Sequence, residues 1–162
     1  MASFGRSFDA RQMTMGAVYR RAMRKDANRL YDIRRRSIIE LALPTMTAAE
    51  AQAWAAKLTR AGMEQKLREL DVWVAELDGR AAGWGAFRGE WLEGLYTDPD
   101  FACRGVGAGL LGVCERLMCE RGIRAVRAEA SSNAMAFYLR RGYLANGPQS
   151  PNGAWPIAKQ LL

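Results

Sequence analysis

LYTDPDFACRGVGAGLL, residues 95–111, is the stretch on which the predicted fold depends. Pro99 and the aspartates beside it end a strand, and the glycine-rich run Arg104–Gly109 follows directly. Apolar residues then recur at helical spacing, at Val106, Leu110, Val113 and Leu117. Glycines let backbone N–H groups come close to a ligand, and the start of a helix favours an anion such as phosphate. The same pattern also fits a tight strand-to-helix turn that binds nothing.

Two familiar phosphate loops do not fit this corner. No Gly-Lys-Ser/Thr follows the glycines, which argues against a nucleoside-triphosphate P-loop. The corner lies past the middle of the chain, and no acidic residue closes a following strand at the spacing that a dinucleotide fold requires. A phosphate bound at this corner would therefore belong to a ligand other than a nucleoside triphosphate or a dinucleotide.

A second stretch, ASSNAMAFYLRRGY at residues 130–143, narrows the choice. Together the two stretches resemble the GNAT superfamily of N-acetyltransferases, in which a glycine corner holds the pyrophosphate of acetyl-CoA and a helix with an Asn, Ala, Phe-Tyr and Gly-Phe/Tyr pattern comes later. The residues that match this second pattern are Asn133, Ala136, Phe137, Tyr138, Gly142 and Tyr143. The resemblance extends from about Val18 to Leu162.

Size and pattern predict one domain over residues 17–162, preceded by a flexible tail, 1–16. We expect a first strand within 17–23 and a helix capped by Asp26 that runs to Leu41 and is stopped by Pro44. Thr47-Ala48-Ala49-Glu50 is a capping box, which predicts a second helix through about Arg60, with a short helical turn at 64–70 after it. Further strands are expected at 71–77, 80–88, 91–97 and 123–130. Helices are expected at 105–121 and 132–142. A pair of antiparallel strands at 143–146 and 155–161 is expected to close the sheet.

The resulting fold class is α/β, an α+β mixed sheet with helices on both faces. The resemblance implies a GNAT-like fold, with a central, mostly antiparallel sheet and a splayed parallel strand pair that receives the cofactor. The implied acetyl-CoA-binding residues are Leu95, Tyr96, Thr97, Ala102, Cys103, Arg104, Gly105, Val106, Gly107, Ala108, Asn133 and Tyr138. One departure is that Ala102 stands where the family usually has Arg or Gln; its backbone N–H remains, and Arg104 could supply a compensating charge.

Acyl transfer to an amine needs a neutral amine and a proton for the leaving thiolate. Tyr138 matches the family's general-acid tyrosine, although a half-buried aromatic packed on the sheet would have the same spacing. Asn133 caps its helix and, by the resemblance, also contacts the pantetheine arm or orders water. Glu93, expected on the same strand face as Leu95 and Thr97, is the candidate general base. Glu90 and Glu129 are its rivals, and each carboxylate could equally be a solvated surface group.

Composition limits the remaining chemistry. The chain has 162 residues, no histidine and three cysteines, so histidine-dependent catalysis is excluded and no metal is expected. Sparse cysteines suit a reducing cytoplasm, and no apolar run is long enough for a membrane span or resembles a secretory signal. The net charge of +7 favours anionic partners, but the basic residues are not interleaved with aromatic ones as in RNA-binding sheets, which disfavours nucleic acid as a partner.

The acceptor is not fixed by the sequence. A small-molecule or peptide amine is expected. The resemblance implies that residues 37–70 and the final hairpin bind it; Trp54, Trp84, Trp91 and Trp155 could line the site or simply fill the core. Cys103 beside the corner has no feature of a nucleophile, so direct transfer in a ternary complex is expected. A homodimer stays open. The alternatives to an acetyltransferase are a non-catalytic acyl-CoA-binding module and a basic nucleic-acid-binding protein.

Overall fold

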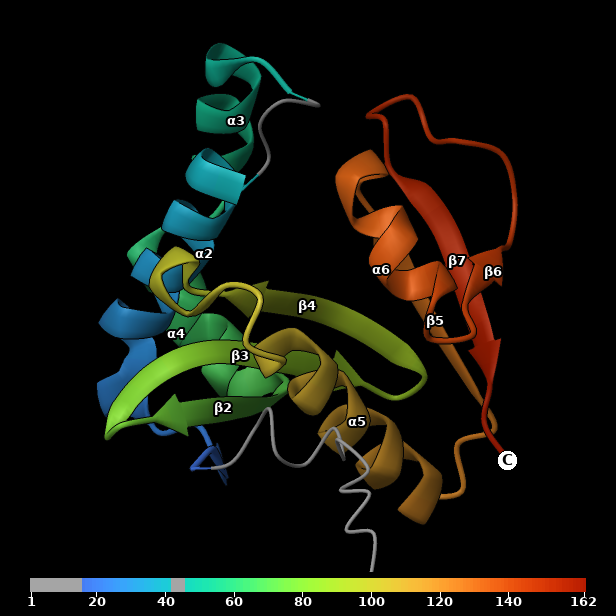
Figure 1. The fold of residues 1–162 in the computed structure, drawn as a ribbon, viewed down its shortest axis with the longest axis horizontal. Coiled ribbons are helices and arrows are strands. Elements are labelled where there is room, and N and C mark those ends of the chain that lie inside the picture. The colour runs from blue at the N-terminus through green and yellow to red at the C-terminus, as the bar shows by residue number, and fades with distance from the viewer. Residues whose placement is uncertain (1–15, 42–45) are drawn as a thin grey trace, which may run out of the picture.

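The computed structural model describes residues 16–41 and 46–162. Within these ranges seven strands form one sheet in the order β1-β2-β3-β4-β5-β7-β6 (Figure 1). The strands are β1 (Val18–Arg21), β2 (Asp71–Leu77), β3 (Arg80–Arg88), β4 (Trp91–Thr97), β5 (Ala125–Ala130), β6 (Leu144–Ala145) and β7 (Trp155–Gln160). The expected tail up to residue 15 and the helix-stopping Pro44 lie outside the described residues. The division into a tail and one domain therefore stays a prediction.

Helices cover both faces of this sheet, which confirms the predicted fold class. The helices are α2 (Ala27–Leu41), α3 (Ala48–Ala55), α4 (Arg60–Glu69), α5 (Val106–Glu120) and α6 (Met135–Leu139). Leu30 and Ile33 of α2 and Met63 of α4 form one core with β2 and β3. Leu111 of α5 and Tyr138 of α6 form the other core with residues of β3, β4, β5 and β7. The sheet is thus sandwiched between two helical layers.

The strand pairings follow the pattern expected from the sequence. β1 to β4 are antiparallel neighbours, and the β2–β3 turn is made by Asp78 and Gly79, both with positive φ (53° and 73°). β4 and β5 are parallel, as the intervening α5 requires. β7 then pairs antiparallel to both β5 and β6. The mixed sheet therefore has one parallel junction, between β4 and β5, among the described strands.

The helix expected from Thr47 through Arg60 is wrong in its length, because α3 ends at Ala55. The capping box itself is present: the Glu50 N–H donates to Thr47 Oγ1 (3.1 Å) and the Thr47 N–H donates to Glu50 Oε2 (3.0 Å). Thr59 begins a second helix, since its hydroxyl accepts from the Gly62 N–H at 2.9 Å. The short turn expected at 64–70 is thus part of the ten-residue helix α4.

Two other helix boundaries also differ from the prediction. Asp26 does not cap α2 in the expected way; its carboxylate accepts from the preceding Met23 N–H (2.7 Å) and pairs with Arg20 (2.8 Å). α6 ends at Leu139, three residues before Gly142, whose φ of 89° terminates the following turn. The partner that holds Asp26, Arg20, lies on a different element, β1, so this arrangement is not evident from the sequence near the helix.

Close contact between β3 and α5 depends on Gly83. A Cβ at this position would lie 2.7 Å from the carbonyl oxygen of Tyr96 and 2.8 Å from Val106 Cγ1. Both neighbours belong to the β4–α5 segment that carries the glycine corner. The absence of a side chain at Gly83 therefore lets the start of α5 sit directly on the sheet.

We predict that Gly83→Ala destabilises the fold by about 1–3 kcal/mol, because backbone and core atoms must shift to admit a methyl group. The control is Gly112→Ala in α5, the helix that packs on Gly83; at Gly112 a Cβ would meet nothing within 4 Å. This control is expected to stabilise the protein by about 0.5–1 kcal/mol, since alanine favours helix. Urea unfolding measures both, and equal effects at the two sites would contradict the close-packing argument.

Candidate active site

The site is built around the edge of β4 that faces β5. The two strands pair at one position, Trp91 with Arg127, and the Arg127 N–H donates to the Glu90 carbonyl at 2.8 Å. Beyond this pair, no described strand lies against the β5-facing edge of β4. Backbone N–H and C=O groups without partners cost free energy when they are shielded from water. The open edge of β4 can therefore bind an extended ligand that carries polar groups.

A bulge in β4 changes which side chains share a face. Ala86 pairs with Gly94 and Phe87 pairs with Leu92, so Glu93 is the extra residue. Consequently Leu92 and Leu95, three positions apart, both pack toward the α5 core. The expectation that simple alternation puts Glu93 on the face of Leu95 and Thr97 is therefore wrong. A bulge of this kind has no signature in the local sequence apart from Gly94.

Asp98 fixes the end of β4 against α2. Its side chain is fully buried, accepts hydrogen bonds from Arg29 Nη2 (2.6 Å) and Arg36 Nη1 (3.1 Å), and caps the following 3-10 turn through the Asp100 N–H (2.8 Å). Arg29 also donates to the Ala81 carbonyl on β3 (2.8 Å). One carboxylate thus connects α2, the sheet and the approach to the glycine corner, whereas the sequence pattern predicts for it only the end of a strand.

The glycine corner presents free backbone donors at the start of α5. Gly105 has φ 79° and Cys103 has φ 60°, a left-handed conformation that turns the chain sharply. In the described structure the amides of residues 103–108 donate no hydrogen bond, as expected at a helix start. The amide of Ala102 does donate, to the Pro99 carbonyl at 3.2 Å. The six amides after Ala102 are therefore the ones that a phosphate group can reach.

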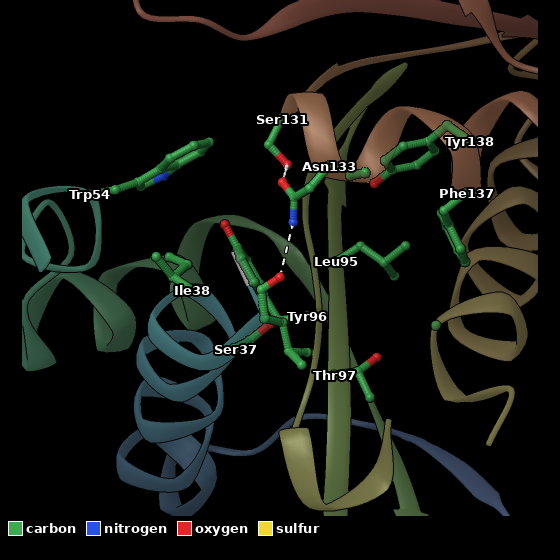
Figure 2. Close-up of a pocket in the computed structure, with 13 residues that line it drawn as sticks. Ser37, Ile38, Trp54, Leu95, Tyr96, Thr97, Ser131, Asn133, Phe137 and Tyr138 are labelled. Carbon is green, nitrogen blue, oxygen red and sulfur yellow. Dashed lines mark hydrogen bonds between the residues drawn. The ribbon is translucent and has the colours of Figure 1, made fainter. Parts of the chain in front are cut away.

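An inner cavity of about 270 Å³ opens between β4, α2, α5 and α6 (Figure 2). Its lining is mostly apolar and aromatic, and it extends from the start of α5 to the end of α2. The lining residues are Ser37, Ile38, Leu41, Trp54, Leu95, Tyr96, Thr97, Gly107, Ser131, Asn133, Ala134, Phe137 and Tyr138. The structure thus brings together the predicted residues Leu95, Tyr96, Thr97, Gly107, Asn133 and Tyr138 at one cavity.

Tyr138 is a buried phenol that faces this cavity. It is 7% exposed, and its ring is held edge-on by Phe137 and Tyr143, with ring centroids 5.1 Å and 5.3 Å away. Its hydroxyl has no hydrogen-bond partner among the described residues. Burial raises the pKa of this hydroxyl well above its usual value, so Tyr138 is protonated at neutral pH. A phenol whose ring is buried and whose unpartnered hydroxyl is open to a cavity is the arrangement that a ligand acceptor atom would complete.

Asn133 connects the two walls of the cavity. Its side-chain oxygen accepts from the Ser131 hydroxyl (2.6 Å), and its nitrogen donates to the Leu41 carbonyl at the end of α2 (3.3 Å), as Figure 2 shows. Capping of its own helix, the structural role expected from the sequence, is not formed. The side chain is instead a bridge across the mouth of the cavity.

A second, larger cavity of about 1080 Å³ lies on the other side of this bridge. Trp54, Ser131 and Asn133 line both cavities. The outer chamber carries three carboxylates, Glu50, Glu93 and Glu129, together with the cations Lys57 and Arg88 and the aromatic face of Trp91. Arg88 Nη2 lies 3.9 Å from Glu93 Oε1. The third carboxylate considered from the sequence, Glu90, is not in this lining and pairs with Arg127 at 3.3 Å.

The four tryptophans considered for the acceptor site separate into two groups. Trp54 and Trp91 line the outer chamber, whereas Trp84 is 1% exposed in the α2-side core and Trp155 packs against the α5-side core. The sequence does not distinguish the two groups of tryptophans, because the burial of each one depends on the order of the strands in the sheet.

The structure also bears on nucleophiles, metals and membranes. Burial raises the pKa of the Cys114 thiol to about 12, so this cysteine is inert. In residues 16–41 and 46–162 no group of three His, Cys, Asp or Glu side chains could hold a metal ion. Over the same ranges no helix is long and apolar enough to cross a bilayer.

Comparison with known proteins identifies the family. The family model described as an acetyltransferase (GNAT) domain matches residues 42–154. The uncharacterized N-acetyltransferase YafP of Escherichia coli (strain K12) is 28% identical over 119 residues, which are 68% of this chain and 75% of that protein. The chain therefore belongs to the GNAT acetyltransferase family, and its general activity is acetyl transfer with acetyl-CoA as donor.

Solved structures agree with this assignment. A GCN5-related N-acetyltransferase from Rhodopseudomonas palustris, described as an aminotransferase of class II, has a TM-score of 0.81 and 28% identity, covering 89% of this chain and 95% of its own. The PaiA N-acetyltransferase of Thermoplasma acidophilum, solved in complex with coenzyme A, shares the fold with a TM-score of 0.78 and 16% identity, covering 90% and 99%. The GNAT-like fold predicted from the two motifs is thus confirmed.

We predict that Asp98→Ala destabilises the protein by about 3 kcal/mol, because it leaves Arg29 and Arg36 without their shared buried carboxylate. The two arginine side chains are 33% and 31% exposed, which keeps the loss at the lower end of the range for a broken buried pair. The matched control is Asp100→Ala, which removes the exposed partner of Arg36 and is expected to change stability little. Urea unfolding gives both values; a loss at Asp98 no larger than at Asp100 would contradict the central role of Asp98.

Proposed function

We propose that this protein transfers the acetyl group of acetyl-CoA directly to a primary amine of a small molecule or peptide, in a ternary complex. The observation that supports this best is the largely buried Tyr138 side chain, whose hydroxyl has no partner among the described residues and is open to a cavity between an unpaired strand edge and six free amides. This arrangement fits a thioester cofactor: donors at one end for its phosphates, an open strand edge for its amide-containing arm, and a proton donor near its sulfur.

In this proposal the backbone of Leu95–Thr97 pairs with the pantetheine arm, and the amides of Cys103 to Ala108 hold the pyrophosphate. Gly107 contributes space as well as an amide, since its Cα lies on the cavity wall between Thr97 and Phe137. Arg104 is exposed and stacks on Phe101, with its guanidinium 5.5 Å from the ring centroid. It is a cation close to the corner where the family arginine or glutamine is replaced by Ala102.

The chemistry requires a C–N bond to form and the C–S bond to break. Backbone N–H groups on the open edge of β4 stabilise the oxyanion that develops on the thioester carbonyl. Tyr138 donates its proton to the departing sulfur; the raised pKa of its hydroxyl keeps the proton available until negative charge develops there.

The acceptor enters from the outer chamber, and Glu93 is the proposed final proton acceptor. The chamber is large, open and lined by three carboxylates and two cations, which suits a polar amine. Glu129 lines the same chamber and is the alternative; Glu90 lies outside it. The acceptor's identity is addressed by a panel of ethylamine, spermidine, glycinamide, kanamycin and short peptides with free N-termini.

Two other functions of this protein can be distinguished from catalysis by binding and turnover measurements. A non-catalytic acyl-CoA-binding module would bind acetyl-CoA and acetylate no amine. A nucleic-acid-binding protein would bind DNA or RNA with a steep salt dependence and ignore acetyl-CoA. The cytoplasm stays the expected location, and a homodimer stays an open prediction.

Acetyl-CoA is expected to raise the unfolding temperature, whereas ATP and NAD do not. A ligand at about a hundred times its Kd adds roughly 2.7 kcal/mol of stability. In Gly107→Leu the shift is expected to disappear, because the side chain projects into the cradle between Thr97 and Phe137. The matched control is Gly112→Leu on the same helix, where a Cβ meets nothing within 4 Å. Retention of the shift in Gly107→Leu would show that the phosphates bind elsewhere.

Tyr138→Phe is expected to lower kcat about 10²-fold and to leave acetyl-CoA affinity nearly unchanged, because only the proton donor is lost. Steady-state kinetics with the fastest amine of the panel and a binding titration measure the two effects. The control is Tyr143→Phe, since the Tyr143 hydroxyl donates to Glu115 (2.9 Å) and is not part of the cavity. A similar loss of kcat in both variants would mean that packing, not proton donation, is responsible.

A further inference from the structure

The inner cavity contains two ionisable side chains among its described lining residues, and both are phenols: Tyr96 and Tyr138. The carboxylates Glu50, Glu93 and Glu129 all lie in the outer chamber. An acceptor amine arrives mostly as an ammonium ion, which cannot attack a carbonyl until it loses a proton. A group at the reacting centre can pass this proton outward to a carboxylate.

The two phenols lie on opposite sides of β4. In Figure 2 the Tyr138 hydroxyl is on the side of Phe137 and α5, where the glycine corner lies, whereas the Tyr96 side chain projects toward α2 and Trp54. Trp54 and Asn133 are shared with the outer chamber. Tyr96 is therefore on the acceptor side of the strand, and Tyr138 is on the cofactor side.

The ring of Tyr96 is held rigidly, but its hydroxyl is free. Trp84 packs against it with ring centroids 5.0 Å apart and is itself fixed by a hydrogen bond from its Nε1 to the Leu30 carbonyl (3.0 Å). Among the described residues the Tyr96 hydroxyl has no hydrogen-bond partner. A phenol with a fixed ring and an uncommitted hydroxyl at a cavity wall is pre-organised to contact a ligand.

A buried cation lies under this ring. Arg34 of α2 is 7% exposed, and its guanidinium carbon is 5.6 Å from the centroid of the Tyr96 ring. Its hydrogen bond goes to the Ala55 carbonyl (3.1 Å), and no described carboxylate pairs with it. A buried cation without a counter-ion favours negative charge that develops nearby. Arg34 is the charged group that the described structure places against the Tyr96 ring, and Tyr138 is the other ionisable group in the lining of the same cavity.

We propose that Tyr96 is a catalytic residue of the acceptor half-site, which relays the proton of the acceptor ammonium from the inner cavity to the carboxylates of the outer chamber. This inference rests on the proposed acetyltransferase function. It gives the side chain of Tyr96 a role separate from the backbone pairing of Leu95–Thr97 with the cofactor. Its basis is the position of the two phenols on either side of β4.

The protons balance in this scheme. The Tyr96 oxygen accepts one proton from the ammonium and releases its own phenolic proton, through water, to Glu93. The neutral amine then forms the C–N bond, the C–S bond breaks, and Tyr138 gives its proton to the sulfur. The second proton that nitrogen loses goes to solvent, and solvent restores Tyr138. The net products are the amide, CoA as the free thiol, and one proton.

The test is the pH dependence of kcat/KM for Tyr96→Phe, with acetyl-CoA and the panel amine that the wild type acetylates fastest. The variant keeps the ring and removes a hydroxyl without protein hydrogen bonds, so it is expected to fold and to bind acetyl-CoA as the wild type does. We expect a loss of at least tenfold below the amine's own pKa, and convergence with the wild type above it, because the free amine needs no relay.

The matched control is Tyr31→Phe, because Tyr31 also carries a stacked arginine (Arg60, 4.5 Å from the ring centroid) but lines neither cavity. Its pH profile should equal that of the wild type. In the double variant with Glu93→Gln, a shared relay predicts a loss smaller than the product of the two single losses.

The possible results separate the two proposals. An unchanged profile, or a loss that is uniform across pH, overturns the relay while the acetyltransferase function stands. A wild-type protein that acetylates no amine of the panel overturns the proposed function and the relay with it. A pH-dependent loss in Tyr96→Phe that is absent from Tyr31→Phe supports the relay.

Discussion

The single paired position between β4 and β5 is the constraint on which the rest of the site depends. Two parallel neighbours that separate after Trp91 and Arg127 leave an open strand edge inside the molecule. The sheet remains intact because β7 satisfies β5 along its whole length, and β3 satisfies the other edge of β4. Within the interior of the described sheet, the unpaired strand edge is thus the one in this gap. An extended molecule with amide groups can complete the sheet there, as an added strand would.

The gap alone would not hold a cofactor, and the buried Asp98 supplies the rigidity around it. The carboxylate receives two arginines from α2 and caps the turn that precedes the glycine corner. Helix α2 and the loop that leads to the glycine corner therefore share one electrostatic anchor. Because Asp98 is fully buried, water cannot replace either arginine at little cost. Rigid placement of two half-sites lowers the entropy cost of bringing two substrates together.

Most of the fold follows from local patterns, and most of the site does not. Asp78-Gly79 predicts its hairpin, and Thr47 with Glu50 predicts its helix start, because the physical cause lies within a few residues. The early end of α3 and the ion pair of Asp26 with Arg20 depend on other elements and could not be inferred. The bulge at Glu93 is a property of strand pairing, so the alternation argument placed that carboxylate on the wrong face. Tyr138 was found through its motif, whereas Tyr96 was noticed only for its backbone.

In the proposed mechanism the two phenols on either side of β4 divide the proton transfers in a chain without histidine. A chain without histidine lacks a side chain that both gains and loses a proton near neutral pH. Two phenols can divide the task if their surroundings differ. Tyr138 has an apolar environment and Tyr96 has Arg34 beneath its ring. In the proposed mechanism β4 lies between the phenol that gives a proton to the departing sulfur and the phenol that accepts one from the ammonium.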